Sequence, residues 1–222
     1  MPTDFIISLV VGTIAMAVVM FLPCRWKVGI PTWKTLFSAA VLTVLGVLGA
    51  KIMFLLESGF WAGTSFYGAV FFPPLFMVLL ALLLHVPPLD LLDLCAPAEC
   101  VMLAILKIQC AVRGILLTTT ADGVYIRFPS QIVELLNALA LMIVLLHFIH
   151  KGVWRGRIYP MYMLLYGITR FVFNLLRDTT PFLLGLPAGN FWSLISIMIA
   201  LIWFYFAEHK KGAAKSEEKI ID

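Results

Sequence analysis

The chain has 222 residues, of which 62% are apolar and only 13% are charged, and its mean hydropathy is +1.02. Soluble domains carry about 45–50% apolar and about 25% charged residues, so this composition excludes an ordinary soluble protein. The surplus apolar surface is too large for one small core, and lipid must cover it. We therefore expect an all-α, polytopic integral membrane bundle.

Apolar runs long enough to cross the roughly 30 Å hydrocarbon core of a bilayer recur along the whole chain. The fourth run begins with interrupting residues, Asp90, Asp93, Pro97 and Glu99, so we expect it to be short, tilted or partly re-entrant. Its three carboxylates are assigned to a loop at the cytoplasmic interface. The predicted seven spans are 5–23, 35–56, 64–86, 92–112, 131–150, 158–176 and 188–207.

Lys and Arg are distributed unevenly over the predicted loops. With seven spans, ten of the sixteen positive residues fall on one side, whereas the opposite loops carry only Arg113, Arg127 and Arg177. Positively charged loops stay in the cytoplasm, so we expect the amino terminus outside and the carboxyl terminus inside the cell. The expected organisation is a seven-span domain at 1–207 and a charged cytoplasmic tail at 208–222.

Three basic residues lie inside apolar runs: Lys51, Lys107 and Arg170. A charge at the bilayer centre costs about 2.5–3.5 kcal/mol on insertion scales, so such residues usually face a cavity or a partner. All three fall in the outer half of the predicted bundle, where Arg113 adds charge. Cations gathered there suit an anionic headgroup, because Arg presents a planar fork to phosphate oxygens. The alternative for Lys51 is that its ammonium group extends to the membrane interface.

Glu134, about one turn into the fifth span, is a nearby acid, as is Glu57. Two roles are open for Glu134: an ion-pair partner for one of the cations, or a catalytic group. The four histidines all fall on the cytoplasmic side of this topology, and the four cysteines show no metal-binding spacing. No metal site is predicted.

Four short motifs occur in a fixed order: S-F-Y-G at 65–68, L-A-I-L-K-I-Q-C at 103–110, R-F-P-S-Q-I-V-E at 127–134 and L-L-Y-G-I-T-R-F at 164–171. They resemble the motifs of the prolipoprotein diacylglyceryl transferases. In that family these regions read approximately S-F-H-G-G, G-R-I-G-[NC]-F, R-H-P-[ST]-Q-L-Y-E and L-Y-G-x-x-R-F. The G-A-K at 49–51 also resembles a family G-A-R. The resemblance extends from about residue 46 to the end of the seventh predicted span.

This resemblance implies transfer of a diacylglyceryl group from phosphatidylglycerol to the lipobox cysteine of a prolipoprotein. The reaction would take place at the outer face of a bacterial plasma membrane, as a step of lipoprotein biosynthesis. Family members have seven spans and need no cofactor, and the implied partners are the phospholipid and the prolipoprotein, with no nucleic acid. In the family, arginines hold the phosphate and the histidine of H-G-G is assigned to proton transfer.

The resemblance also assigns roles residue by residue. Arg170 matches the arginine of L-Y-G-x-x-R-F, and Lys107 stands where the arginine of G-R-I-G would be. Tyr67 occupies the place of the H-G-G histidine. The predicted catalytic residues are Tyr67, Glu134 and Arg170, and the predicted substrate-binding residues are Lys107, Gly68, Arg113, Gln131 and Lys51.

Two departures from the family pattern bear on function. Histidine is absent at both Tyr67 and Phe128, and a phenol with an unperturbed pKa of about 10 is a poorer base than imidazole. Lys107 keeps the positive charge but loses the two-pronged geometry of Arg. One hypothesis is a divergent transferase in which Tyr67 or Glu134 accepts the proton. The alternative is a catalytically silent relative that binds an anionic lipid or a membrane protein. A transporter is disfavoured, because the chain shows no halves with matching interrupted helices.

Overall fold

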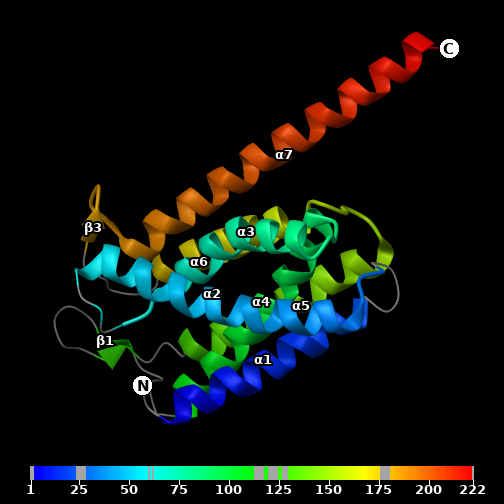
Figure 1. Ribbon diagram of the computed structural model, residues 1–222. Helices are drawn as coiled ribbons and strands as arrows, with labels where there is room; N and C mark the ends of the chain where they lie inside the picture. The colour runs from blue at the N-terminus through cyan, green and yellow to red at the C-terminus, as the bar shows by residue number, and fades with distance from the viewer. Residues whose placement is uncertain are drawn as a thin grey trace.

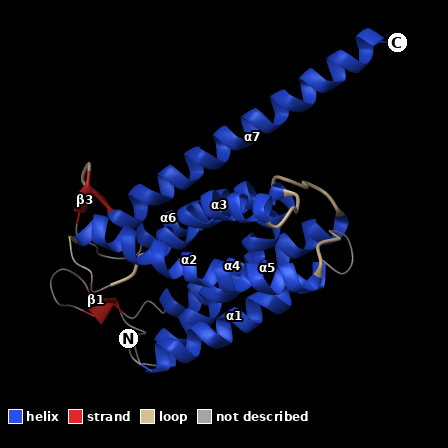
Figure 2. Ribbon diagram, in the orientation of Figure 1, coloured by secondary structure: helices blue, strands red, loops and turns tan. Residues whose placement is uncertain are grey.

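The structure, a computed structural model, describes residues 3–23, 29–59, 61, 63–112, 118–119, 125–126, 130–175 and 181–221. In this part of the chain, seven helices and two short strand pairs are present (Figures 1 and 2). The helix positions follow the predicted runs closely, and the predicted all-α membrane bundle is confirmed. The helices are α1 (Thr3–Pro23), α2 (Thr32–Ser58), α3 (Phe66–Leu83), α4 (Pro88–Val112), α5 (Ser130–Lys151), α6 (Ile158–Leu175) and α7 (Ala188–Ile221).

Five helices are long and apolar enough to cross a membrane: α1, α2, α3, α5 and the first part of α7, Ala188–Ala207. Helix α4 differs because it lies at the centre, in contact with α1, α2, α3, α5 and α6. Every residue from 90 to 100 is buried. Because this first half of α4 is enclosed by other helices, the polar residues there find partners within the bundle.

Helix α4 corrects two of the predictions made from its sequence. It runs unbroken from Pro88 to Val112 through Pro97, so the run is neither short nor interrupted, and its tilt in the membrane stays a prediction. Asp90, Asp93 and Glu99 are buried residues of this helix, so their assignment to an interface loop is wrong. Hydropathy alone cannot distinguish a carboxylate in a loop from one that is enclosed by neighbouring helices.

Helices α2 and α3 cross with their backbones in contact. A Cβ atom added to Gly68 would meet the carbonyl group of Gly49, and one added to Gly49 would meet the carbonyl oxygen of Gly68. Only residues without a side chain allow this approach. The crossing fixes the first turn of α3, which carries Tyr67.

The strand pairs were not predicted. Strand β1 (Thr118–Thr119) pairs antiparallel with β2 (Tyr125–Ile126), and β3 (Pro181–Leu183) pairs with β4 (Leu186–Pro187). The turn between β3 and β4 has positive φ at Leu184 (55°) and Gly185 (74°), as a two-residue type I′ turn requires. Both pairs lie at the end of the bundle where the amino terminus lies (Figure 1). The two pairs lie in the α4–α5 and α6–α7 connections, which meet the same end of the bundle because successive helices alternate in direction.

The last helix extends well beyond the bundle (Figure 1). Helix α7 passes Ala207 without a break and ends at Ile221. The division of the chain at residue 207, the cytoplasmic location of the tail and the outside location of the amino terminus stay predictions.

Candidate functional site

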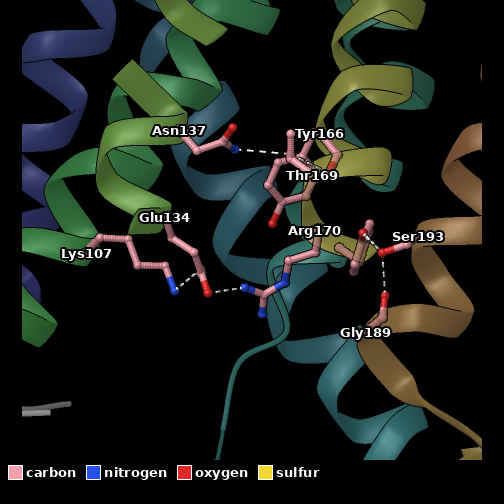
Figure 3. A network of polar contacts seen from close by, with 9 residues as sticks. Lys107, Glu134, Asn137, Tyr166, Thr169, Arg170, Gly189 and Ser193 are labelled. Carbon is pink, nitrogen blue, oxygen red and sulfur yellow. Dashed lines mark hydrogen bonds and ion pairs between the residues drawn. The ribbon is translucent and has the colours of Figure 1, made fainter. Parts of the chain in front are cut away.

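Three charged side chains from three helices meet near the amino-terminal end of the bundle. Lys107 lies near the end of α4, Glu134 near the start of α5 and Arg170 near the end of α6. The Nζ atom of Lys107 is 2.6 Å from Oε2 of Glu134, and Nη1 of Arg170 is 2.5 Å from Oε1 (Figure 3). One carboxylate therefore holds two cations, which leaves this trio with a net charge of +1 and suits it to an anion.

Lys107 and Arg170 also border a cavity of about 430 Å³. The rest of its wall is mainly apolar and is built largely from α1, α2, α3 and α4, with lining residues that include Leu9, Met16, Leu42, Val47, Phe66 and Leu103. An apolar cavity with cations at one place on its wall suits an amphiphile with an anionic headgroup. Neither Glu134 nor Tyr67 is among the lining residues, so Glu134 reaches the cavity only through its two cations.

Tyr67 is hydrogen-bonded across the bundle to α7. Its hydroxyl lies 2.5 Å from Oγ of Ser193, and the Ser193 hydroxyl donates to the carbonyl oxygen of Gly189 at 2.6 Å (Figure 3). Because the single serine proton is used in that bond, the phenol of Tyr67 is the donor to Ser193. The Tyr67 ring also packs against Tyr166 and Phe71. The side chain of Tyr67 therefore contacts residues of α6 and α7 as well as its own helix.

The other predicted site residues lie outside the ion-pair trio. Lys51 donates from Nζ to the carbonyl oxygen of Trp61 at 3.4 Å, beyond the end of α2, and it does not line the cavity. The Oε1 atom of Gln131, in the first turn of α5, is buried and has no hydrogen-bond partner in the described part of the chain. Gly68 forms the contact between α2 and α3. Arg113 lies outside the described residues, as does Phe128.

Two residues at or near the site were missed from the sequence. Glu99 lines the same cavity and is only 4% exposed. Its place in an apolar run was the available signal, the same one that identified Lys107. Ser193 gave no signal, because its bond to Tyr67 joins positions 126 residues apart.

Comparison with known proteins identifies the family of this chain. The family model for prolipoprotein diacylglyceryl transferase matches residues 6–206. The chain is 28% identical over 212 residues to phosphatidylglycerol–prolipoprotein diacylglyceryl transferase 2 of Clostridium perfringens. This alignment covers 83% of each protein. It is also 34% identical over 95 residues to the phosphatidylglycerol–prolipoprotein diacylglyceryl transferase of Burkholderia thailandensis, over 40% of this chain and 32% of that relative. The chain therefore belongs to the prolipoprotein diacylglyceryl transferase family and is a multi-pass membrane transferase of that type.

Proposed function

We propose that this chain transfers a diacylglyceryl group from phosphatidylglycerol to the lipobox cysteine of a prolipoprotein at the outer face of the bacterial plasma membrane. The observation that carries the proposal is the pair of cations, Lys107 and Arg170, on the wall of an apolar cavity. The names of the two relatives support this lipid and this acceptor.

Arg170 can bind a phosphate without releasing Glu134. A guanidinium group has five N–H donors and the pair with Glu134 is formed through Nη1, so other donors remain for phosphate oxygens. Lys107 presents an ammonium group with three donors, and its Nζ atom lies 2.6 Å from Oε2 of Glu134. The Glu134 carboxylate thereby holds both cations in place for the lipid headgroup.

The reaction makes one bond and breaks one bond at the same carbon. The sulfur of the acceptor cysteine attacks the glycerol carbon of the diacylglyceryl group, and the bond from that carbon to the phosphate oxygen breaks. Glycerol phosphate leaves with an additional negative charge. Lys107 and Arg170 stabilise this charge as it develops, which is the kind of electrostatic assistance that accelerates group transfer most.

The thiol proton needs an acceptor, and the geometry favours Glu134 over Tyr67. When the phosphate engages Lys107 and Arg170, their attraction for the Glu134 carboxylate weakens and the carboxylate becomes available as a base. The hydroxyl of Tyr67, by contrast, is held in its hydrogen bond with Ser193, on the side of the bundle formed by α7.

The position of Tyr67 also favours a second candidate function. A phenol tied to Ser193 replaces the proton-transfer histidine of the family, so a catalytically silent relative would keep lipid binding at Lys107 and Arg170 and lose transfer. Such a protein would serve as a binding module for an anionic lipid or a partner membrane protein.

Lipidation of a prolipoprotein in a bacterial host without its own transferase distinguishes the two functions. The wild-type chain is expected to yield a lipid-modified acceptor. Arg170→Ala is expected to reduce transfer by about 10²–10³-fold, the usual effect of removing one electrostatic group, and Arg170→Lys, which keeps the charge, to reduce it less.

Retention of phosphatidylglycerol by the purified proteins is measured in parallel. An enzyme loses turnover with Arg170→Ala, with Tyr67→Phe or with both. A silent binder shows no transfer in any form and loses lipid retention only with Arg170→Ala. Absence of a lipid-modified acceptor with the wild-type chain would reject the transferase.

A further inference from the structure

One carboxyl group, that of Glu99, also lines the cavity that Lys107 and Arg170 border. Glu99 lies eight residues before Lys107 on α4, which is about 12 Å along the axis at 1.5 Å per residue. Between them, Met102, Leu103 and Leu106 form an apolar part of the same wall. No ion pair to Glu99 occurs among the described residues. A buried carboxyl without a cation is stabilised in its neutral form, because an unpaired buried charge is very costly.

The hydrogen bonds around Glu99 support a proton on its carboxyl group. The hydroxyl of Tyr159 donates toward the carbonyl oxygen of Val70 at 2.8 Å and toward Oε1 of Glu99 at 3.0 Å. The Val70 carbonyl has lost its helical partner, because the residue four positions on is Pro74, which has no N–H. Tyrosine has one hydroxyl proton, and the orphaned carbonyl is the nearer acceptor. A protonated Glu99 satisfies both neighbours, since it donates to the oxygen of Tyr159.

We propose that Glu99 is a second lipid-binding residue of the cavity: its neutral carboxyl group donates a hydrogen bond to an ester carbonyl of the diacylglyceryl group while Lys107 and Arg170 hold the phosphate. This inference rests on the proposed function. The carboxyl proton turns from Tyr159 to the lipid, and the Tyr159 hydroxyl stays on the Val70 carbonyl. Glu99 would thereby favour glycerolipids with ester-linked chains.

The dimensions of a phospholipid fit this arrangement. Six bonds separate the phosphorus atom from the carbonyl carbon of the outer ester, about 7 Å when extended at roughly 1.2 Å per bond. One hydrogen bond of about 3 Å at each end brings the span to about 13 Å. The backbone positions of Glu99 and Lys107 are about 12 Å apart along the helix axis, so a lipid of this length can reach both side chains. The intervening apolar wall faces the glycerol carbons, which need no polar partner.

The test compares two lipids that differ only in the ester carbonyl. Phosphatidylglycerol with ester-linked chains and its ether-linked analogue of equal chain length are titrated into the purified protein in nanodiscs. The wild-type chain is expected to bind the ester lipid about fivefold more tightly, which corresponds to about 1 kcal/mol. Glu99→Leu should abolish this preference. Glu99→Gln, whose amide is a neutral donor, should keep most of it.

Matched controls make each outcome decisive. Leu92→Met changes a buried apolar residue of α4 that does not line the cavity, and it is expected to keep the wild-type ester preference. The inference would be overturned if folded Glu99→Leu kept the ester preference of the wild-type chain, or if Glu99→Gln lost that preference completely. Either result would leave the proposed function standing. If the wild-type chain retained neither lipid, the proposed function and this inference would both fail. Thermal unfolding of each variant establishes that the compared proteins are folded. If Glu99→Leu does not fold, the ester preference of Glu99→Gln alone tests the inference.

Discussion

The bundle buries carboxylates toward both of its ends, and two of them, Glu134 and Asp93, are satisfied in opposite ways. Glu134 pairs with two side-chain cations, Lys107 and Arg170, which also border the cavity. Asp93, toward the other end, accepts hydrogen bonds from three backbone N–H groups at the start of α6. Backbone donors cannot turn away without unfolding that turn, whereas side-chain cations can turn to a ligand. These donors are Gly156, Ile158 and Tyr159, at 2.5, 3.0 and 3.2 Å.

Asp90, three residues earlier on α4, is held by a side-chain cation as Glu134 is, but that cation, Arg155, belongs to the connection before α6. Nε and Nη2 of Arg155 donate to its two oxygens at 2.6 and 2.5 Å, and the hydrogen bond to Asp90 raises the pKa of Arg155. Both Asp90 and Asp93 therefore attach the connection before α6 to the central helix. The hollow beside them is about 220 Å³, half the size of the cavity at Lys107. The comparison distinguishes carboxylates that hold the fold together from one that organises a binding site.

The strongest test of this distinction removes the shared carboxylate. Glu134→Ala is expected to lower the free energy of unfolding by about 3–5 kcal/mol, because it leaves two cations that are only 16% and 19% exposed without their counter-charge. Added phosphatidylglycerol should restore part of the loss, since its phosphate can replace the carboxylate. Denaturant unfolding in detergent measures both effects. A free energy of unfolding equal to that of the wild-type chain would contradict the account, and Glu134→Gln serves as the isosteric control.

Removal of Asp93 should affect the fold and leave the chemistry intact. Asp93→Ala leaves three buried N–H groups without their acceptor, and we expect a loss of about 2–3 kcal/mol in the free energy of unfolding. Added phosphatidylglycerol should not restore the free energy of unfolding that this variant loses. Transfer per folded molecule should equal that of the wild-type chain, measured by lipidation of a lipobox peptide. Loss of transfer in folded Asp93→Ala would contradict the distinction between a carboxylate that supports the fold and one that organises the binding site.

A smaller effect is expected when a guanidinium group replaces the ammonium group of Lys107 at the cavity. Lys107→Arg should tighten phosphatidylglycerol binding by roughly three- to tenfold, because guanidinium binds phosphate through two parallel hydrogen bonds. Lys51→Arg is the matched control, since Lys51 does not line the cavity, and it should leave the affinity unchanged. Equal tightening by both substitutions would show that the added affinity does not come from the cavity.

The sequence predicted the features that depend on local composition. Long apolar runs located all seven helices, because a span needs about 20 apolar residues. The cost of a charge in hydrocarbon singled out Lys107 and Arg170, and Glu134 followed as a nearby acid. Helix α4 was misjudged at its start, because its carboxylates read as solvent-facing when they are enclosed by other helices.

Features that depend on packing between distant segments could not be predicted. The bond from Tyr67 to Ser193 and the contact of Tyr159 with Glu99 each join helices far apart in the chain. The shared use of Glu134 by two cations likewise depends on how α4, α5 and α6 meet. These contacts decide which groups can reach the lipid, so the chemistry of the site required the structure.

The position of the phosphate in a structure of this protein with bound phosphatidylglycerol tests the central claim most directly. We expect its oxygens to lie about 3 Å from Nζ of Lys107 and from the guanidinium group of Arg170, with Glu134 between the two cations and the glycerol in the cavity. A phosphate bound elsewhere in the bundle, out of contact with both Lys107 and Arg170, would contradict the account.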